Sequence, residues 1–266
     1  MRILMLPFTA VRNGLEFLGG WSYLLRDMLA SVPRALCSAR GRRLGWRNLW
    51  AQMDRVGIRS IPIVSLVLFC IGSILALQMA PSLADYGEVR RVADIIAIAV
   101  YRELGPLVSA IVLTGFAGAS IAAEIGTMVV SEEIEALEAG AISPVRFLVV
   151  PRVLATTVMT VCIAIVGDIM GMVGGIAVAL SVLGMGLRQY LTYTWSALVL
   201  KDFISGLVKA GVFGLIISSL ACFLGLRVTG GAQGVGVATT RTVVLTIVAL
   251  IFVDLMFTAT FYFLGI

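Results

Sequence analysis

The sequence predicts an all-α integral membrane protein, in which N-terminal interfacial helices precede about five transmembrane helices. Apolar residues make up 60% of the 266 residues and charged residues 13%, whereas soluble globular chains hold roughly 45–50% apolar and about 25% charged residues. The apolar residues form continuous runs, and roughly 20 such residues are enough for an α-helix to cross a bilayer. A transmembrane β-barrel is disfavoured because its strands would alternate apolar and polar residues.

The N-terminal part, residues 1–56, is expected to form interfacial or elbow helices. Trp46 and Trp50 stand among arginines here, and tryptophan with arginine suits a helix that lies in the lipid headgroup layer. We therefore expect one or two interfacial helices over residues 8–55. The arginines clustered in residues 1–60 also predict a cytoplasmic N-terminus. Anionic lipid headgroups are a nearer partner for them than nucleic acid.

Residues 57–266 are expected to form a transmembrane domain with five membrane crossings. The predicted spans are residues 57–80, 95–129, 147–182, 196–226 and 243–264. The second span contains "YRELGP" (101–106), and Pro106 predicts a break or kink there because proline removes a helical hydrogen bond. Residues 184–190 are expected to form a turn and residues 227–242 a glycine-rich connection. Five crossings from a cytoplasmic N-terminus would place the C-terminus in the periplasm.

A short acidic segment separates the second and third predicted spans. Ser131 suits a helix N-cap, and Gly140 and Pro144 suit its end, which predicts a helix of about two turns over residues 132–139. Its acidic residues are Glu132, Glu133, Glu135 and Glu138, and Ile134 and Leu137 lie on the other side. A helix this short is not stable alone. We expect it to dock on the membrane domain or on another protein; a solvated loop helix is the alternative.

Charged residues inside the predicted spans are candidate functional residues because burying a charge in a bilayer is costly. These residues are Arg102, Glu103, Glu124, Asp168, Lys209 and Asp254. Arg102 and Glu103 either contact or gate a substrate, or form an ion pair that stabilises the break. Lys209 and Asp254 are expected to pair if the fourth and fifth spans run antiparallel. Glu124 is expected to brace the acidic helix.

Small residues recur at helical spacing in two of the predicted spans. One stripe runs through Gly115, Ala119, Ala122, Ala123 and Gly126, and the other through Gly167, Gly171 and Gly175. Small residues let transmembrane helices approach closely. The stripes therefore predict either a seam between two copies of the chain or packing within one bundle.

Several kinds of chemistry are disfavoured by the residues present. The chain has no histidine, which argues against a metal site and against histidine-based catalysis. A Walker A motif needs Gly-Lys-Ser/Thr, and neither Lys201 nor Lys209 follows a glycine. We therefore expect a chain that is not an enzyme and has no cofactor of its own. If ATP drives transport, another polypeptide binds it.

Three stretches resemble the MlaE-type permease family, the membrane subunit of MCE-associated ABC lipid transporters. They are "YRELGPLVSAIVLTGFAGASIAAEIGTM" (101–128), "EEIEALEAGAISPVRFLVVPRVLA" (132–155) and "ATTRTVV" (238–244). The resemblance covers residues 60–266 well and residues 1–59 weakly. The sequence departs from the family at Phe116, where members often carry arginine.

The resemblance implies a homodimer in a bacterial inner membrane, with a separate ABC ATPase below it. A periplasmic MCE-domain protein, as a hexameric ring, would sit above it, and some systems add a STAS-domain protein. The acidic helix would be the coupling helix that enters a groove of the ATPase. Phospholipid is the default substrate, although sterols or other lipids stay open.

The same resemblance places "YRELGP" near a lipid cavity. Arg102 and Glu103 would contact or gate lipid there, and Leu77, Leu104 and Leu107 would line apolar walls with Leu66 and Val100, which suits acyl chains. The alternative is an ion-coupled secondary transporter of an amphipathic substrate, using Glu103, Asp168 and Asp254. No convincing internal repeat supports that alternative. A membrane scaffold would explain the acidic helix but not the charges within the spans.

Overall fold

The computed structural model describes the backbone of residues 2–37 and 39–264, with side chains described for residue 12 and residues 14–31 and 48–264. Within this part of the chain all regular elements are helical, and five helical stretches are long and apolar enough to cross a membrane. The predicted all-α membrane fold is therefore confirmed. The Trp46 side chain, part of the evidence for interfacial helices, lies outside the described side chains.

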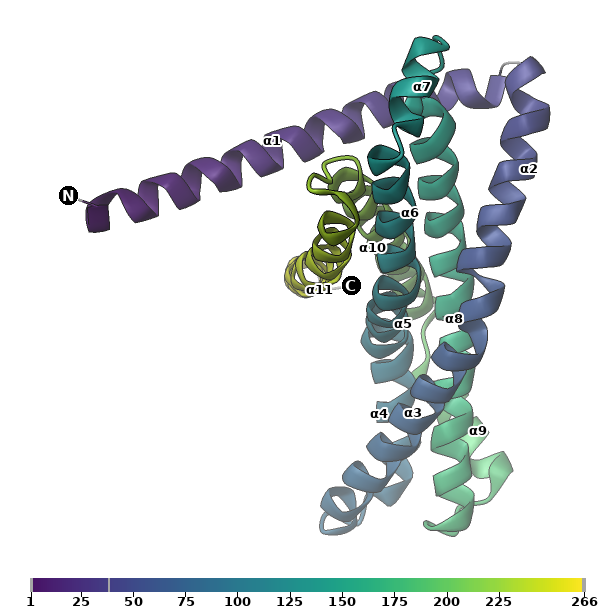
Figure 1. Cartoon of the computed structure of the whole chain (residues 1–266). Coiled ribbons are helices and arrows are strands. Elements are labelled where there is room, and N and C mark those ends of the chain that lie inside the picture. The colour runs from purple at the N-terminus through teal and green to yellow at the C-terminus, as the bar shows by residue number, and fades with distance from the viewer. Residues whose placement is uncertain (1, 38, 265–266) are drawn as a thin grey trace.

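Two N-terminal helices precede the first span. Helix α1 (Arg2–Cys37) extends away from the bundle, and α2 (Ala39–Val56) runs along it (Figure 1). A single 3₁₀ turn, η1 (Ile58–Ser60), joins α2 to α3 (Ile61–Ala84). Among the described residues, the first candidate span, Asn48–Ala84, includes the predicted span over residues 57–80. Pro62 does not interrupt it because the first turn of a helix needs no backbone donor at that position.

The second span, Val89–Val130, is a chain of helical segments with two π-helical turns. Its elements are η2 (Val89–Arg91), α4 (Val92–Ala99), the π-helix η3 (Val100–Leu104), α5 (Gly105–Leu113), the π-helix η4 (Thr114–Gly118) and α6 (Ala119–Val130). The acidic helix α7 (Glu133–Ala139) follows. A third π-helix, η5 (Val145–Val149), leads into α8 (Val150–Ser181).

The last two spans differ from the prediction at their starts. Residues 184–190 were expected to form a turn, but α9 (Leu187–Ala197) occupies most of this connection, and α10 (Leu200–Gly225) begins after it. Residues 227–242 were expected to be a glycine-rich connection, but α11 (Gly231–Leu264) is helical from Gly231 onward. Glycine has a low helix propensity, and the packing of α11 against α6 and α10 outweighs it here.

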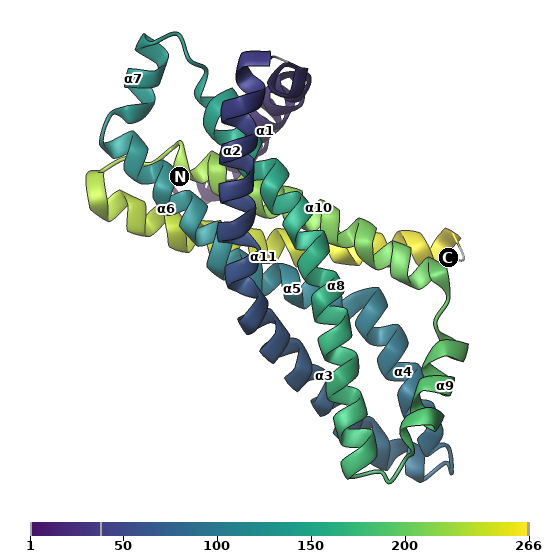
Figure 2. The same cartoon turned by 90° about the vertical axis from the view of Figure 1, so that its right-hand side faces the viewer.

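Helix α8 is central to the bundle and packs most extensively against α3 and α10 (Figure 2). Its glycines are the contact points with neighbours in the same chain. A Cβ on Gly72 of α3 would lie 1.9 Å from the carbonyl oxygen of Gly171, and one on Gly174 would lie 2.1 Å from the carbonyl oxygen of Phe69. Gly175 leaves room for the Tyr190 hydroxyl of α9. Tyr190 is fully buried there, and this burial raises the pKa of its hydroxyl to about 12. The stripe on α8 therefore serves packing within one bundle.

We expect Gly72→Ala to destabilise the protein by about 1–3 kcal/mol, because the new methyl group forces α3 away from α8. A lowered thermal unfolding midpoint in detergent would show the loss. Gly115→Ala is the matched control, since a Cβ there meets nothing within 4 Å. Equal midpoints for the two variants would contradict the close contact at Gly72.

Large apolar side chains cover the outside of the molecule. On α3 and α11, the side chains of Leu66, Phe252 and Leu255 are each more than 60% exposed. Together with the five apolar helices, these exposed faces describe a multi-pass membrane protein, whose outer surface meets lipid or another membrane chain.

Candidate functional site

The segment "YREL" forms the π-helix η3 in the middle of the second span. Pro106 follows shortly after it, and a proline ring clashes with the carbonyl of the fourth residue before it, here Arg102. The wider π turn accommodates this clash, so the predicted break is a local change of helix type. A proline stands in the same relation to η5, where Pro151 follows Val149. π-Helical turns frequently occur at functional sites.

Helix α10 approaches η3 closely enough to bring charged residues together. Gly206 makes this possible, because a Cβ at that position would lie 2.2 Å from the carbonyl oxygen of Tyr101. The rings of Tyr101 and Phe203 pack edge to face beside it, with centroids 5.9 Å apart. One turn further along α10, Lys209 therefore reaches the level of Glu103.

Lys209 is fully buried and lies between two carboxylates. Its Nζ donates a hydrogen bond of 2.5 Å to Glu103 Oε2 and one of 3.1 Å to Thr258 Oγ1. The same Nζ lies 2.9 Å from Asp254 Oδ1. Thr258 in turn donates to Glu103 at 3.2 Å. We call Glu103, Lys209, Asp254 and Thr258 the charge cluster; it joins η3, α10 and α11.

The charge cluster contains one cation and two carboxylates, and its exposure is uneven. The Glu103 side chain is 30% exposed, whereas that of Asp254 is 15% exposed and that of Lys209 is 0% exposed. Glu103 is therefore the most exposed of the three charged members, and the exposed Thr258 lies beside it. A polar or charged group of a bound molecule could compete with Lys209 for this carboxylate.

Arg102 does not pair with Glu103, although the sequence left such a pair open. Its Nη1 lies 3.4 Å from Asp202 Oδ1, near the start of α10. The other Asp202 oxygen accepts a hydrogen bond of 3.4 Å from the backbone N–H of Val199 and so caps α10. The two neighbouring charged residues of η3 therefore bind different residues of α10. The sequence analysis did not identify Asp202 as a partner of Arg102; the feature that could have indicated it is an acidic side chain in the first turn of α10.

The structure pairs Lys209 with Asp254, as the antiparallel arrangement of the last two spans predicted, but it adds Glu103. Asp168, on α8, is buried, and its Oδ1 has no hydrogen-bond partner among the described residues. This oxygen lies against Gly105, where a Cβ would come within 1.6 Å of it. Asp168 therefore packs under the end of η3 and is not a member of the charge cluster.

The predicted apolar wall residues lie in different environments. Leu77 is 48% exposed on α3, and Leu104 and Leu107 are half-buried in the second span. Val100, by contrast, is fully buried against Gly171. Contact between lipid and Leu77, Leu104 or Leu107 stays a prediction.

Helix α7 projects from one end of the bundle (Figures 1 and 2). The four glutamates of the acidic segment, Glu132 just before the helix and Glu133, Glu135 and Glu138 within it, are exposed, and Ile134 and Leu137 are half-buried. No Lys or Arg among the described side chains forms an ion pair with any of the four glutamates. The acidic face is thus available for a basic surface of another molecule.

The ends of α7 differ from the prediction. The helix starts at Glu133, and its N-cap is Glu132, which has a left-handed φ of 60°. The hydroxyl of Ser131, the predicted N-cap, instead lies within hydrogen-bond distance of the Thr127 carbonyl oxygen and of the Glu133 carboxylate, to which it can donate. Ala141, just after the helix, also has a positive φ of 57°. Left-handed backbone is costly for residues other than glycine, so both ends of α7 are held in strained turns.

Glu124 does not brace α7, which corrects the prediction. Its carboxylate forms ion pairs with Arg55 of α2 and with Arg152 of α8, the latter at 3.1 Å. Arg152 is buried and also donates to the carbonyl of Leu148 in η5 at 3.2 Å. Glu124 therefore ties three helices together at the base of α7. A cavity of about 580 Å³ is lined by these three charged residues and by Glu133 of α7.

Five apolar spans, a charge cluster between three of them and a projecting amphipathic helix define a multi-pass membrane protein with charged groups inside its bundle. The model of the MlaE permease family matches residues 49–260. The chain therefore belongs to the MlaE permease family.

The chain is also similar to named proteins of bacteria and of a plant. A probable ABC transporter permease protein of Rickettsia typhi is 41% identical over 193 residues, which are 73% of this chain and 74% of the relative. One from Synechocystis is 34% identical over 223 residues, 84% of each chain. The chloroplastic protein TRIGALACTOSYLDIACYLGLYCEROL 1 of Arabidopsis thaliana is 31% identical over 220 residues, 83% of this chain and 63% of the relative. The family favours an ABC permease over the ion-coupled alternative.

Proposed function

We propose that this chain is the membrane subunit of an ABC-type lipid transporter, which moves phospholipid between the bacterial inner membrane and a periplasmic MCE-domain protein. A separate ATPase would bind ATP and supply the energy, and a STAS-domain protein could join it. The observation that carries the transporter assignment is the projecting acidic helix α7 on a chain of the MlaE permease family. An ABC permease works with an ATPase, and α7 offers that ATPase an exposed acidic face above a half-buried apolar one.

A lipid substrate is supported by two observations of different kinds. The name of the Arabidopsis relative contains that of a galactolipid. In this chain, Glu103 is the most exposed charged member of the charge cluster, and exposed apolar residues of α11 such as Ile251 and Leu255 lie close to Asp254 in the sequence, which suits a molecule with a polar head and apolar tails. The homodimer is supported by α11, whose apolar residues Val248, Ile251 and Phe252 are more than half exposed.

The proposed orientation places α7 and the N-terminus in the cytoplasm and the C-terminus in the periplasm. Arg146 lies at the start of η5 and Arg227 in the connection between α10 and α11, both on the α7 side, and cytoplasmic connections are enriched in arginine and lysine. An ATPase would then meet α7 directly.

The first test is to purify the tagged chain from its native membranes in mild detergent and to identify the co-purifying proteins by mass spectrometry. Recovery of an ABC ATPase together with an MCE-domain protein would support the proposal. Recovery of the chain alone from an intact preparation would contradict it, and uptake against a proton gradient would then be the next measurement.

We expect Glu103→Ala to lower phospholipid transfer at least tenfold while the protein still folds. Lys209 keeps its ion pair with Asp254 in this variant, so no buried charge is left alone. Transfer would be measured with fluorescent phospholipid in proteoliposomes that hold the chain and its partners. Glu103→Gln retains an acceptor for Thr258 and separates the effect of charge from that of the hydrogen bond. Normal yield with wild-type transfer in Glu103→Ala would refute this role.

A further inference from the structure

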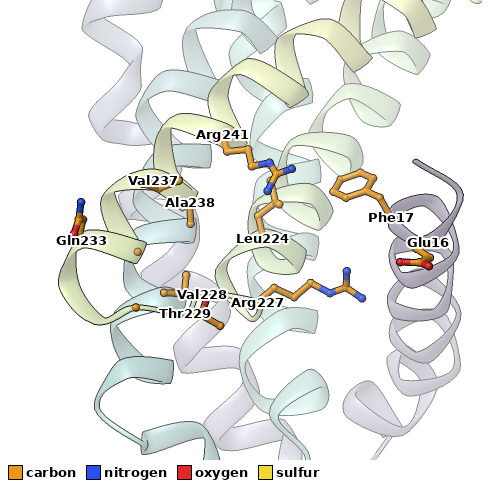
Figure 3. Close-up of a pocket in the computed structure, with 12 residues that line it drawn as sticks. Glu16, Phe17, Leu224, Arg227, Val228, Thr229, Gln233, Val237, Ala238 and Arg241 are labelled. Carbon is orange, nitrogen blue, oxygen red and sulfur yellow. The ribbon is translucent and has the colours of Figure 1, made fainter. Parts of the chain in front are cut away.

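A cavity of about 520 Å³ lies between α1 and the corner that joins α10 to α11 (Figure 3). Arg227 and Arg241 line it from the corner, and Phe17 lines it from α1. Figure 3 shows both arginine side chains extending toward α1. Arg241 precedes Asp254 by 13 residues on α11, about 20 Å along the helix, so this cavity is separate from the charge cluster.

The Arg227 side chain is held in place by contacts that leave its charge unneutralised. Its guanidinium stacks over the Phe223 ring, 4.3 Å from the centroid. Gly20 of α1 makes room for it, because a Cβ on Gly20 would lie 2.6 Å from Arg227 Nη2. A stacked guanidinium keeps its hydrogen-bond donors free for an anion.

The carboxylates described near the cavity do not neutralise these two arginines. Glu16 also lines the cavity, but its Oε1 pairs with Arg12 Nε at 3.4 Å on the exposed side of α1. Within the described part of the chain, neither Arg227 nor Arg241 forms an ion pair. The cavity thus has an excess of positive charge.

The rest of the wall fits a phosphate that carries apolar substituents. Thr229 and Gln233 supply polar groups beside the arginines, whereas Phe17, Leu224 and Val237 are apolar. Arginine recognises phosphate oxygens through paired N–H donors. We propose that this cavity is a phosphate-binding site held by Arg227 and Arg241, for the phosphate of a lipid headgroup or for free phosphate. Binding there would fasten α1 to the α10–α11 corner.

The test is native mass spectrometry of the full chain in detergent, titrated with a short-chain phosphatidylglycerol. We expect the double variant R227Q/R241Q to bind it about tenfold more weakly than the wild type, as two charge-assisted contacts are lost. The control is R90Q/R188Q, which removes the same charge from exposed arginines outside this cavity and should bind as the wild type does. A diacylglycerol with the same chains, which has no phosphate, should not distinguish wild type from R227Q/R241Q.

Arg227→Gln also removes the stacking on Phe223, so R241Q alone serves as a second variant that leaves this contact intact. It should weaken binding about threefold or more. Excess inorganic phosphate identifies the source: displacement of the lipid supports a site for free phosphate, and retention of the lipid supports a headgroup site. Equal affinity of wild type, R241Q and R227Q/R241Q would overturn the proposal. An equal loss in R90Q/R188Q would overturn it too, since it would show only a general effect of charge.

Discussion

Lys209→Met is expected to destabilise the protein by about 3–5 kcal/mol, because it leaves the carboxylates of Glu103 and Asp254 beside each other without their cation. Methionine has a similar length and removes only the ammonium group and its contacts. The Lys209 ammonium is fully buried, and it is within 2.5 Å of one carboxylate and 2.9 Å of the other. A lowered thermal unfolding midpoint in detergent and a lower yield from membranes would report the loss.

The control for this variant is Lys201→Met, on the first turn of the same helix. Lys201 is exposed, so the substitution should change the free energy of unfolding by no more than about 0.5 kcal/mol. A triple variant that adds Glu103→Gln and Asp254→Asn to Lys209→Met should regain much of the lost stability, because no charge is then buried unpaired. Matching midpoints for Lys209→Met and Lys201→Met would show that the charge cluster does not stabilise the bundle.

The five spans and the acidic helix could be predicted from the sequence because both are local patterns. Each span is a continuous apolar run, and α7 is marked by its glutamates between two such runs. Helix α9 was missed because it is short and of mixed polarity, although Leu187, Leu191 and Trp195 recur every four residues and are all exposed. That spacing was the signal that could have found it.

The partners of the charged residues could be predicted only in part, because distant segments decide them. Lys209 and Asp254 lie on consecutive spans, so an antiparallel pair was a natural expectation. Glu103 is 106 residues from Lys209, and their contact depends on Gly206 letting α10 approach η3. The two arginines that bind Glu124 come from α2 and α8, and no local pattern links them to α6.

The π-helix at Val100–Leu104 could be predicted in its position but not in its geometry. Pro106 correctly marked the position where the helix changes, but the sequence could not say whether the chain would break, kink or widen. The structure widens it, which keeps the span continuous while Arg102 and Glu103 bind different residues of α10. As a result, two neighbouring residues of one π turn form ion pairs with two residues of α10: Arg102 with Asp202, and Glu103 with Lys209.

Glu138→Lys is expected to reduce the amount of ATPase that co-purifies with this chain at least tenfold, with a matching loss of transport. Glu138 is exposed on the acidic face of α7, and a reversed charge facing a basic groove replaces attraction with repulsion. Because Glu138 lies in the last turn, where the helix dipole favours a cation, the substitution does not weaken α7 itself. Glu135→Lys would be a poorer test, since Glu135 lies in the first turn.

The matched control is Asp85→Lys, a charge reversal at an exposed position after α3, at the end of the bundle away from α7 (Figure 1). It should leave both the recovered ATPase and the thermal midpoint unchanged. A lysine-to-glutamate change in the facing groove of the ATPase should restore part of the binding to Glu138→Lys, which only a direct contact would allow. Full recovery of the ATPase with Glu138→Lys would mean that α7 does not dock on the ATPase through its acidic face. The next substitutions would then be at the half-buried Ile134 and Leu137, to test whether α7 packs only against its own bundle.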